Sequence, residues 1–145
     1  MKKLFSILAA ALVATATITP AQAELSQDGK VAVEYFNTLE TYMNNMTAVL
    51  EKVTDQASAD AQAEPFAAAV QVFTAYIASM ESRANELTGM PNADDEAAFE
   101  QCQNNLHAAG MALQAELQRL AMVNFYDSEA FIKVLTTLNQ PAEWQ

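Results

Sequence analysis

Apolar side chains recur at alternating intervals of three and four residues along three long segments of the chain. This spacing returns to one side of an α-helix and does not fit the two-residue period of a strand. The three series are Val31, Tyr35, Leu39, Tyr42, Met46, Val49 and Val53; Phe66, Val70, Phe73, Ile77, Met80, Ala84 and Leu87; and Phe99, Cys102, Leu106, Ala109, Leu113, Leu117 and Leu120. Each segment is therefore predicted to form an amphipathic helix that buries one face.

Capping and turn residues predict where the first two helices begin and end. The first helix is expected over about 28–54. Ser58 is the predicted N-cap of the second helix, because its hydroxyl can accept a bond from an orphan backbone N–H. Pro65 predicts a kink, or a short lead-in turn before the main helix, since it lacks a backbone donor. Gly89 suits the C-terminal cap.

The last part of the chain predicts a third long helix and a short fourth one. Asn92 can cap the third helix, and the acidic residues 94–96 lie in its first turn, where the helix dipole favours negative charge. The apolar pattern breaks at 124–127, after which Asp127 or Ser128 can cap a short helix. Because the connections are short, successive helices are expected to be antiparallel. The predicted fold is all-α, an antiparallel up-down-like bundle of three long helices and a short C-terminal helix.

The N-terminus has the composition of a secretory signal. Two lysines at 2–3 precede the uncharged apolar stretch 4–16, and Ala21 and Ala23 are small residues of the kind that signal peptidase requires. The stretch is shorter than the roughly 20 apolar residues of a spanning helix. We expect cleavage after Ala23, a single domain over 24–145, export to the periplasm or the medium, and no stable membrane insertion.

Charge limits the partners of the processed chain. Its 122 residues contain 18 acidic and 5 basic side chains, a net charge of about −13. Nucleic acid phosphates and anionic lipids would repel such a chain. We therefore expect no nucleic acid partner, and the acidity favours either simple solubility or a cationic partner.

The segment 50–65 resembles a known arrangement. It contains a leucine-led helix end, a Thr-Asp turn at 54–55, an Ala-Ser-Ala run at 57–59 and a proline at 65, and an acidic proline-initiated helix follows from Pro91. This order resembles an uncharacterised family of small exported bacterial helical-bundle proteins. The resemblance implies a bundle and no known activity. The order of elements is also similar to that of the periplasmic four-helix b-type cytochromes.

His107 is the only histidine, and it is the centre of an alternative hypothesis. Histidine and methionine can ligate haem, and thioethers also suit Cu(I), so His107 with Met43, Met46 or Met111 is a candidate haem or metal site. The cytochromes carry their ligands on the first and last helices, whereas His107 lies in the third. The simpler interpretation of His107 is a boundary histidine that bonds a neighbouring helix or water.

Catalytic constellations are not evident. Cys102 and His107 are about 140° apart on one helix, so they do not form a nucleophile–base pair there, and Cys102 is expected as a small buried hydrophobe. Asn104 occupies the position where a Glu-x-x-His metal motif has its glutamate. The acids at 94–96 and Glu100 lack the pattern of a calcium loop and are predicted to form a solvated helix start. We expect no enzyme activity, no metal site and no cofactor.

These observations favour an exported non-enzymatic helical protein. The sustained heptad-like spacing is typical of coiled-coil surfaces, which act by protein–protein interaction or self-association. The alternative is a small haem- or metal-binding carrier of the periplasm centred on His107. A holdase chaperone of the envelope is a third hypothesis with the same composition.

Overall fold

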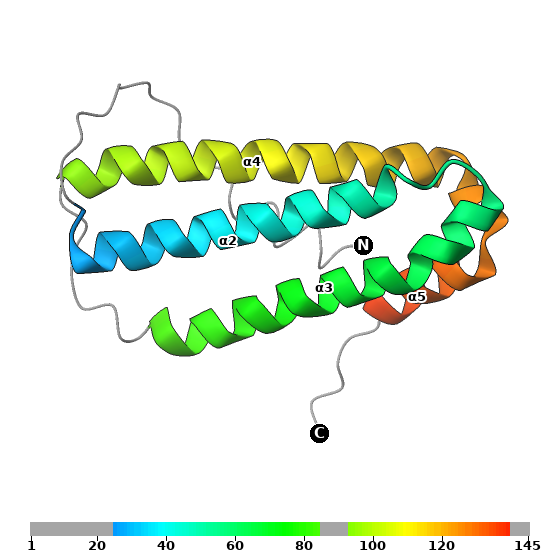
Figure 1. Cartoon of the computed structure of the whole chain (residues 1–145), viewed down its shortest axis with the longest axis horizontal. Helices are drawn as coiled ribbons and strands as arrows, with labels where there is room; N and C mark the ends of the chain where they lie inside the picture. The colour runs from blue at the N-terminus through cyan, green and yellow to red at the C-terminus, as the bar shows by residue number, and fades with distance from the viewer. Residues whose placement is uncertain (1–24, 85–92, 140–145) are drawn as a thin grey trace.

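The computed structural model describes residues 25–84 and 93–139, and within these the chain is helical with no strand. The elements are α2 (Gln27–Leu50), α3 (Gln56–Ala84), α4 (Ala93–Met122), the short η1 (Asn124–Asp127) and α5 (Glu129–Asn139) (Figure 1). The all-α helical bundle is thus confirmed. The predicted signal segment, the caps at Gly89 and Asn92, and Trp144 lie outside the described residues.

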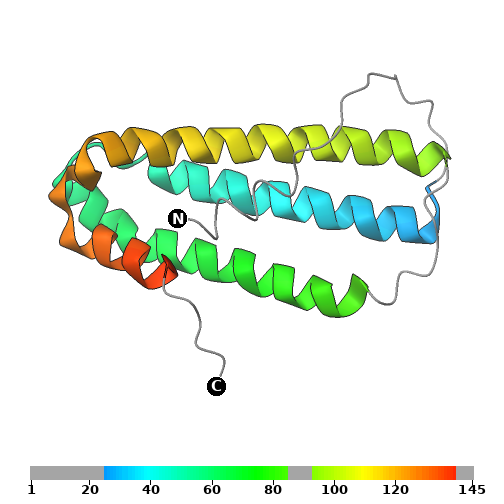
Figure 2. The same ribbon diagram turned by 180° about the vertical axis from the view of Figure 1, so that it is seen from behind.

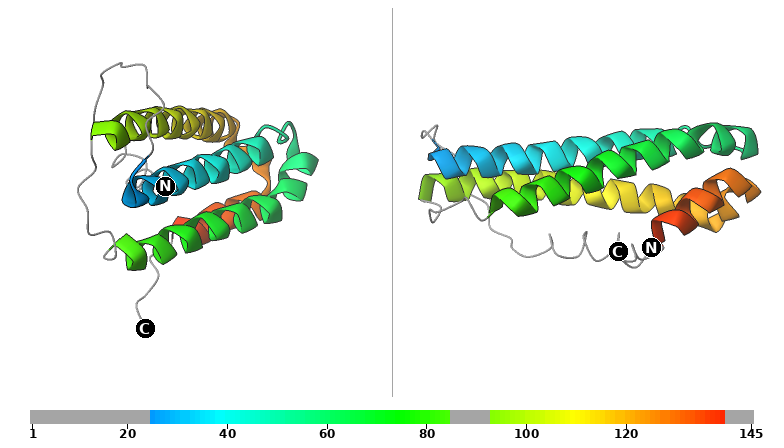
Figure 3. Two further views of the ribbon diagram at one scale, coloured as in Figure 1. Left: turned by 60° about the vertical axis from the view of Figure 1, so that its left-hand side comes forward. Right: turned by 90° about the horizontal axis from the view of Figure 1, so that it is seen from below.

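The helix α2 lies between two neighbours. It packs against α4 on one side and against α3 on the other, and the contact with α4 is the more extensive. The short α5 packs beside α3, as the views from behind and from below show (Figures 2 and 3). Figure 1 shows that α2 and α4 begin at one end of the bundle, whereas α3 and α5 begin at the other. The pairs α2 with α4 and α3 with α5 therefore each run in one direction, whereas α2 and α3 run in opposite directions.

The best-buried part of the core lies at the end where α5 packs. Phe131 of α5 stacks between two other rings, with its centroid 5.4 Å from that of Phe66 and 5.6 Å from that of Phe125. The largest fully buried apolar side chains gather around this stack: Met46, Leu50, Val53, Phe66, Leu113, Leu120 and Phe131. Burial of this apolar surface is the main stabilising contribution to the fold.

The buried face of α2 differs in part from the predicted stripe. Met43 and Leu50, which lie at its edge in the sequence pattern, are buried, whereas Tyr35 and Tyr42 are only partly buried. Both tyrosines instead pack on Tyr76 of α3, at centroid distances of 5.8 and 5.5 Å. The reason is that α2 has two neighbours, so its apolar surface is divided between α4 and α3.

Two predicted helix ends are wrong by a few residues. Helix α2 ends at Leu50 rather than Thr54, because the chain tightens there and the Val53 amide donates to the Leu50 carbonyl at 3.0 Å. The N-cap of α3 is Asp55 rather than Ser58. The Ser58 amide donates to Asp55 Oδ1 at 2.8 Å and the Asp55 amide donates to Ser58 Oγ at 2.9 Å, a reciprocal capping box. These bonds from Ser58 lower the pKa of the Asp55 carboxyl.

Helix α3 passes through Pro65 as one element, without a separate lead-in turn. Pro65 is exposed, and so is Ala61, whose carbonyl is left without the usual i+4 donor. Water can therefore bond that carbonyl, which reduces the cost of the proline.

The connection from α4 to α5 is a left-handed turn. Asn124, Phe125, Tyr126 and Asp127 all have positive φ, between 47° and 56°, although none is glycine. Such backbone costs about 1–2 kcal/mol per residue. Burial of Phe125 and a 2.7 Å bond from Asn124 Nδ2 to Asp127 Oδ1 offset part of this cost. The predicted break in the pattern is confirmed here, and so is the cap at Ser128, whose hydroxyl accepts from the Phe131 amide.

Candidate functional site

The N-terminus of α2 is capped by a carboxylate from α4. Asp95 is fully buried, and its two oxygens accept bonds from the Ser26 amide at 2.9 Å and the Ser26 hydroxyl at 2.6 Å. The Ser26 hydroxyl in turn accepts from the Gly29 amide at 2.9 Å. A negative charge at a helix N-terminus is stabilised by the helix dipole. Asp95 therefore fixes the start of α2 against the start of α4.

The burial of Asp95 contradicts the prediction of a solvated helix start at this residue, whereas Glu96 is exposed as predicted. Asp95 precedes Phe99, Cys102 and Leu106 at intervals of four, three and four residues, so it continues the apolar stripe of α4. The α2 N-terminus supplies the donors that a buried carboxylate requires. The spacing in the sequence therefore indicated that Asp95 could be buried. Nothing in the sequence indicated that Ser26 would be its hydrogen-bond partner.

The C-terminus of α2 is capped by a cation from the same helix α4. The Arg119 guanidinium donates to the carbonyls of Leu50 at 3.0 Å and Val53 at 3.1 Å. Glu116 lies 2.7 Å away as an ion-pair partner and raises the pKa of Arg119 above its ordinary value. Both ends of α2 thus receive the charge that complements its dipole.

The parallel pair α3 and α5 has a similar contact between a serine and an aspartate. The Ser128 hydroxyl, which caps α5, donates to Asp60 Oδ1 of α3 at 2.5 Å, and Ser128 is fully buried. In each pair the N-cap serine of one helix bonds an aspartate near the start of its neighbour. These serine–aspartate contacts are structural, because their polar atoms are used within the fold.

The residues of the alternative haem or metal site lie in different environments. Met43 and Met46 are buried in the core, whereas His107 is exposed and Met111 is 51% exposed on α4. His107 and Met111 share an outer face of α4, four residues apart. The structure therefore does not bring His107 together with Met43 and Met46.

Cys102 is buried, as predicted for a small hydrophobe. Its thiol donates to Asn37 Oδ1 at 3.4 Å. Burial raises the pKa of the Cys102 thiol, and the nearby charge of Glu40 raises it further. A thiol held neutral in this way is a poor nucleophile at neutral pH.

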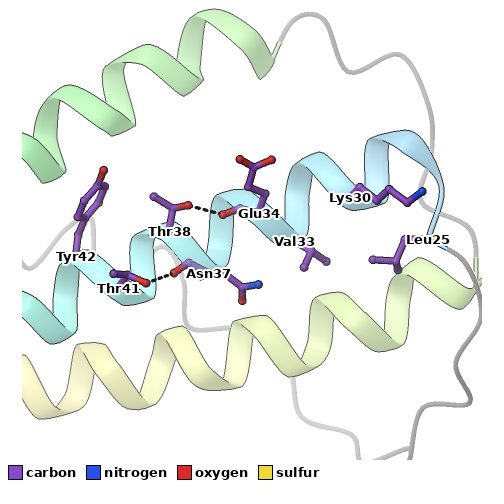
Figure 4. Close-up of a pocket in the computed structure, with 8 residues that line it drawn as sticks. All are labelled: Leu25, Lys30, Val33, Glu34, Asn37, Thr38, Thr41 and Tyr42. Atoms are coloured by element: carbon purple, nitrogen blue, oxygen red, sulfur yellow. Dashed lines mark hydrogen bonds between the residues drawn. The ribbon is translucent and has the colours of Figure 1, made fainter.

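The outer face of α2 carries a shallow depression of 520 Å³ (Figure 4). The residues that line it are Leu25, Lys30, Val33, Glu34, Asn37, Thr38, Thr41 and Tyr42. Thr38 and Thr41 already donate to the carbonyls of Glu34 and Asn37 on the same helix. The hydroxyls of Thr38 and Thr41 are therefore already used within α2, and the lining residues come from one side of this helix. A ligand site usually has polar groups that converge from several elements, which this depression lacks.

A more distinctive feature is that α5 covers only part of the bundle. It has 11 residues and α3 has 29, and the contacts of Ser128 with Asp60 and Phe131 with Phe66 align the two helices from the start of α3. By helical register α5 ends near Phe73. Among the described helices, α5 does not extend to the remainder, α2 residues 27–39, α3 residues 74–80 and α4 residues 95–106, which we call the uncovered half.

Several side chains that continue the core stripes into the uncovered half are only partly buried, whereas Leu39, Cys102 and Leu106 in the same segments are buried. In this half Phe36 meets Phe99 edge-on, with centroids 6.4 Å apart. The partly buried apolar side chains here are Tyr35, Phe36, Tyr76, Ile77, Met80 and Phe99. At the end where α5 packs, Phe66, Leu120 and Phe131 are fully buried, whereas Ala69 and Leu117 are partly buried.

The described helices contain neither a metal-binding cluster nor a membrane-spanning segment. No three His, Cys, Asp or Glu side chains in residues 25–84 and 93–139 gather closely enough to hold a metal ion. None of the helices in this part is both long and apolar enough to cross a bilayer. No family model, curated protein or solved structure matches the chain.

Proposed function

We propose that this chain is an exported, non-enzymatic helical protein of the cell envelope that acts by protein–protein contact at the uncovered half of its bundle. The proposal takes the helices as an up-and-down bundle whose fourth helix has less than half the length of each of the others. The proposal also includes the secretory signal and the periplasmic or secreted location that the sequence predicts.

The observation that carries the proposal is the contrast between the two halves of one core. Phe66 and Phe131 are fully buried beside α5, whereas Ile77 and Phe99 are partly exposed where α5 is missing. The partly exposed aromatic and aliphatic side chains of this half are the apolar surface that the proposal assigns to a protein contact. A helix supplied by another protein or another copy would bury them.

Site-specific photo-crosslinking tests the proposal. A photoreactive residue is placed at Ile77 or Phe99 in the uncovered half, and as matched controls at Gln118 and Val72, which are exposed. We expect discrete adducts of higher mass from the first two positions in cells that export the protein, and none from the controls.

Sedimentation over a range of concentrations separates the two forms of contact. Self-association predicts a mass that rises with concentration and adducts of twice the chain mass. A monomer that yields no adduct at Ile77 or Phe99 would overturn the proposed function.

A further inference from the structure

We propose that two copies of this chain exchange their α5 helices, with residues 124–127 opening from a left-handed turn into a continuous helix between α4 and α5. This inference goes beyond the proposed function, because it involves neither the uncovered half nor another protein. Two independent observations carry it: the backbone of the turn, and the exposed apolar side chains beside it.

The closed turn contains backbone strain at four successive residues. Asn124, Phe125, Tyr126 and Asp127 have φ between 47° and 56°. In this region the Cβ of an L-residue lies too close to the following carbonyl oxygen, and only asparagine and aspartate among these types adopt it readily. None of the four is proline or glycine, so all of them can enter a right-handed helix. Opening the turn relieves the strain and lets the helical hydrogen-bond pattern continue from α4 into α5.

The directions of the helices suit an exchange. Helices α3 and α5 both begin at the end of the bundle where α4 ends, and they run away from it side by side (Figures 1 and 3). A straightened connection would send α5 past this end instead of back along its own α3. A second copy that faces the same end across a two-fold axis presents its α3 in the matching direction. Each α5 would then lie parallel to the α3 of the other copy, as it now lies beside its own.

The contacts that hold α5 can form equally well between two copies. The Ser128 hydroxyl donates to Asp60 Oδ1 at 2.5 Å, and the Phe131 and Phe66 rings stack with their centroids 5.4 Å apart. Each contact joins α3 to a residue beyond the turn, so the α3 of a second copy offers the same partners. The exchange therefore retains these contacts, and the relief of strain in both turns offsets the freedom that two chains lose on association.

The exchange gives up contacts of the closed turn. Among them are the 2.7 Å bond from Asn124 Nδ2 to Asp127 Oδ1 and the stacking of Phe125 on Phe131 at 5.6 Å. Water replaces the first of these, because it lies at the surface. The stacking of Phe125 is the larger loss and requires new apolar burial.

Exposed apolar side chains lie at the point where the two copies would meet. Met122, the last residue of α4, is 88% exposed, and Val123 is 42% exposed. A two-fold contact brings the same residues of both copies together, so Met122 and Val123 would form an apolar patch on each side of the axis. Burial of this patch replaces the packing that Phe125 loses.

Charge sets the conditions for the exchange. Asp127 and Glu129 are exposed and acidic near the same axis, so two copies repel one another at low salt. An ionic strength of about 0.5 M, at which the Debye length is only about 4 Å, should therefore favour the exchanged dimer.

Disulfide trapping between two different chains tests the exchange. Cys102→Ala removes the native thiol from both chains; one chain then has Asp60→Cys, and a second, differently tagged chain has Ser128→Cys. After mixing at high protein concentration and mild oxidation, we expect a mixed disulfide, because these positions meet between chains only in the exchanged dimer. As a matched control, Glu34→Cys in place of Asp60→Cys puts an exposed thiol on α2 and should give only collisional crosslinking. A single chain with both Asp60→Cys and Ser128→Cys should form the disulfide within the dilute monomer, which checks that the pair can bridge.

Two substitutions at one position of the turn test the role of strain. Asn124→Gly and Asn124→Ala both remove the bond to Asp127. Glycine adopts a φ of 47° freely and disfavours the open helix, whereas alanine is strained at this φ and favours the helix. Each dimer contains two turns, so the alanine variant should dimerise at least about tenfold more tightly than the glycine variant in sedimentation equilibrium. Met122→Gln should weaken the dimer of the native chain by at least about threefold.

Two results would overturn the exchange. One is no mixed disulfide beyond the Glu34→Cys control, although the doubly substituted monomer forms its own disulfide. The other is equal dimerisation of the glycine and alanine variants, once circular dichroism has shown that both are helical. The trapping experiment retains the native turn, so it decides the question if a turn variant does not fold.

The outcomes also separate the exchange from the proposed function. A dimer that is lost in Ile77→Gln but is unaffected by substitution of Asn124 overturns the exchange and supports contact at the uncovered half. A mixed disulfide in a chain that yields no crosslink at Ile77 supports the exchange and counts against the proposed function.

Discussion

At the scale of single residues, the contact of Ser26, Gly29 and Asp95 shows how strongly one position can constrain another far away in the sequence. A Cβ added at Gly29 would lie 2.2 Å from Asp95 Oδ1, closer than real contacts allow. Glycine is required here for close approach, since it lets a buried carboxylate reach the α2 N-terminus. Ser26 and Asp95 are 69 residues apart, so no local pattern announces this contact.

Substitution of Gly29 tests this contact. Gly29→Ala is expected to lower the free energy of unfolding by about 1–3 kcal/mol, because the new methyl group displaces the Asp95 carboxylate. Gln27→Ala, at an exposed position in the same turn, is the control and should be near neutral. Chemical denaturation measures both.

A double-mutant cycle makes the cause specific. In an Asp95→Ala background the clash is gone, so Gly29→Ala should cost less than in the native chain. Equal costs in the two backgrounds would show that Gly29 acts for a reason other than room for Asp95.

The buried thiol of Cys102 gives a pH-dependent prediction. Its pKa in the folded chain is raised from an ordinary value of 9.0, so the contribution to stability is present below that value and is lost as pH rises through the folded pKa. We expect thiol reagents to modify Cys102 only slowly at neutral pH. Cys102→Ala should remove the alkaline loss of stability that comes from this group, as measured by thermal unfolding from pH 8 to 10.

At the scale of elements, the ends of helices were less predictable than their existence. The three- and four-residue spacing of residues such as Phe66, Val70 and Phe73 predicts the helices and their buried faces, because burial and helical period alone determine that pattern. The N-cap of α2 is its own Ser26, a residue type that favours this position, but Asp95 and Arg119, which bond the two ends of α2, lie on another helix and no local pattern indicates them. Sequence reasoning therefore placed the helices but not the contacts that align them.

The candidate surface was predictable to a similar extent. The acidic excess favours either solubility or a cationic partner, and the stripe predicts that Ile77 and Phe99 face the core. The partial exposure of Ile77 depends on the length of α5 and on the side of α3 where it packs. Only the tertiary arrangement determines that, so the uncovered half could not be located from the sequence.

Arg119 provides a prediction for the α2 C-terminus. Arg119→Met keeps much of the apolar stem but removes the bonds to the Leu50 and Val53 carbonyls. Because the side chain is 39% exposed, we expect a modest loss of about 1 kcal/mol in the free energy of unfolding. Lys133→Met, at an exposed position of α5, is the control. A loss no larger than that of the control would contradict a capping role.

The left-handed turn can be tested by two substitutions at one exposed position. Asn124→Gly and Asn124→Val both lose the bond to Asp127, but only valine is strained at a φ of 47°. The valine variant should be less stable than the glycine variant by about 1–2 kcal/mol, as measured by urea unfolding. Equal stabilities would mean that the turn relaxes to an ordinary backbone.

At the scale of the whole molecule, the bundle is predicted to be more stable at the end that α5 covers. Phe131→Ala, in the stack of three rings, should cost about 3–5 kcal/mol, whereas Phe99→Ala should cost no more than about 1–2 kcal/mol because its ring is partly exposed. Hydrogen exchange should show the same gradient. Amides near Leu50, Phe66 and Leu113 should exchange more slowly than those of the uncovered half.

The matched capping of α2 also restricts how this protein can change in evolution. Ser26 and Leu50 are 24 residues apart, and so are Asp95 and Arg119, which bond them from the parallel helix α4. A surface loop tolerates the insertion or deletion of one residue. In α2 or α4 the same change would rotate and shift one end of the helix, so that this end would lose its capping partner. The two helices can therefore lengthen or shorten only by the same number of residues, so the length of each is fixed by the other.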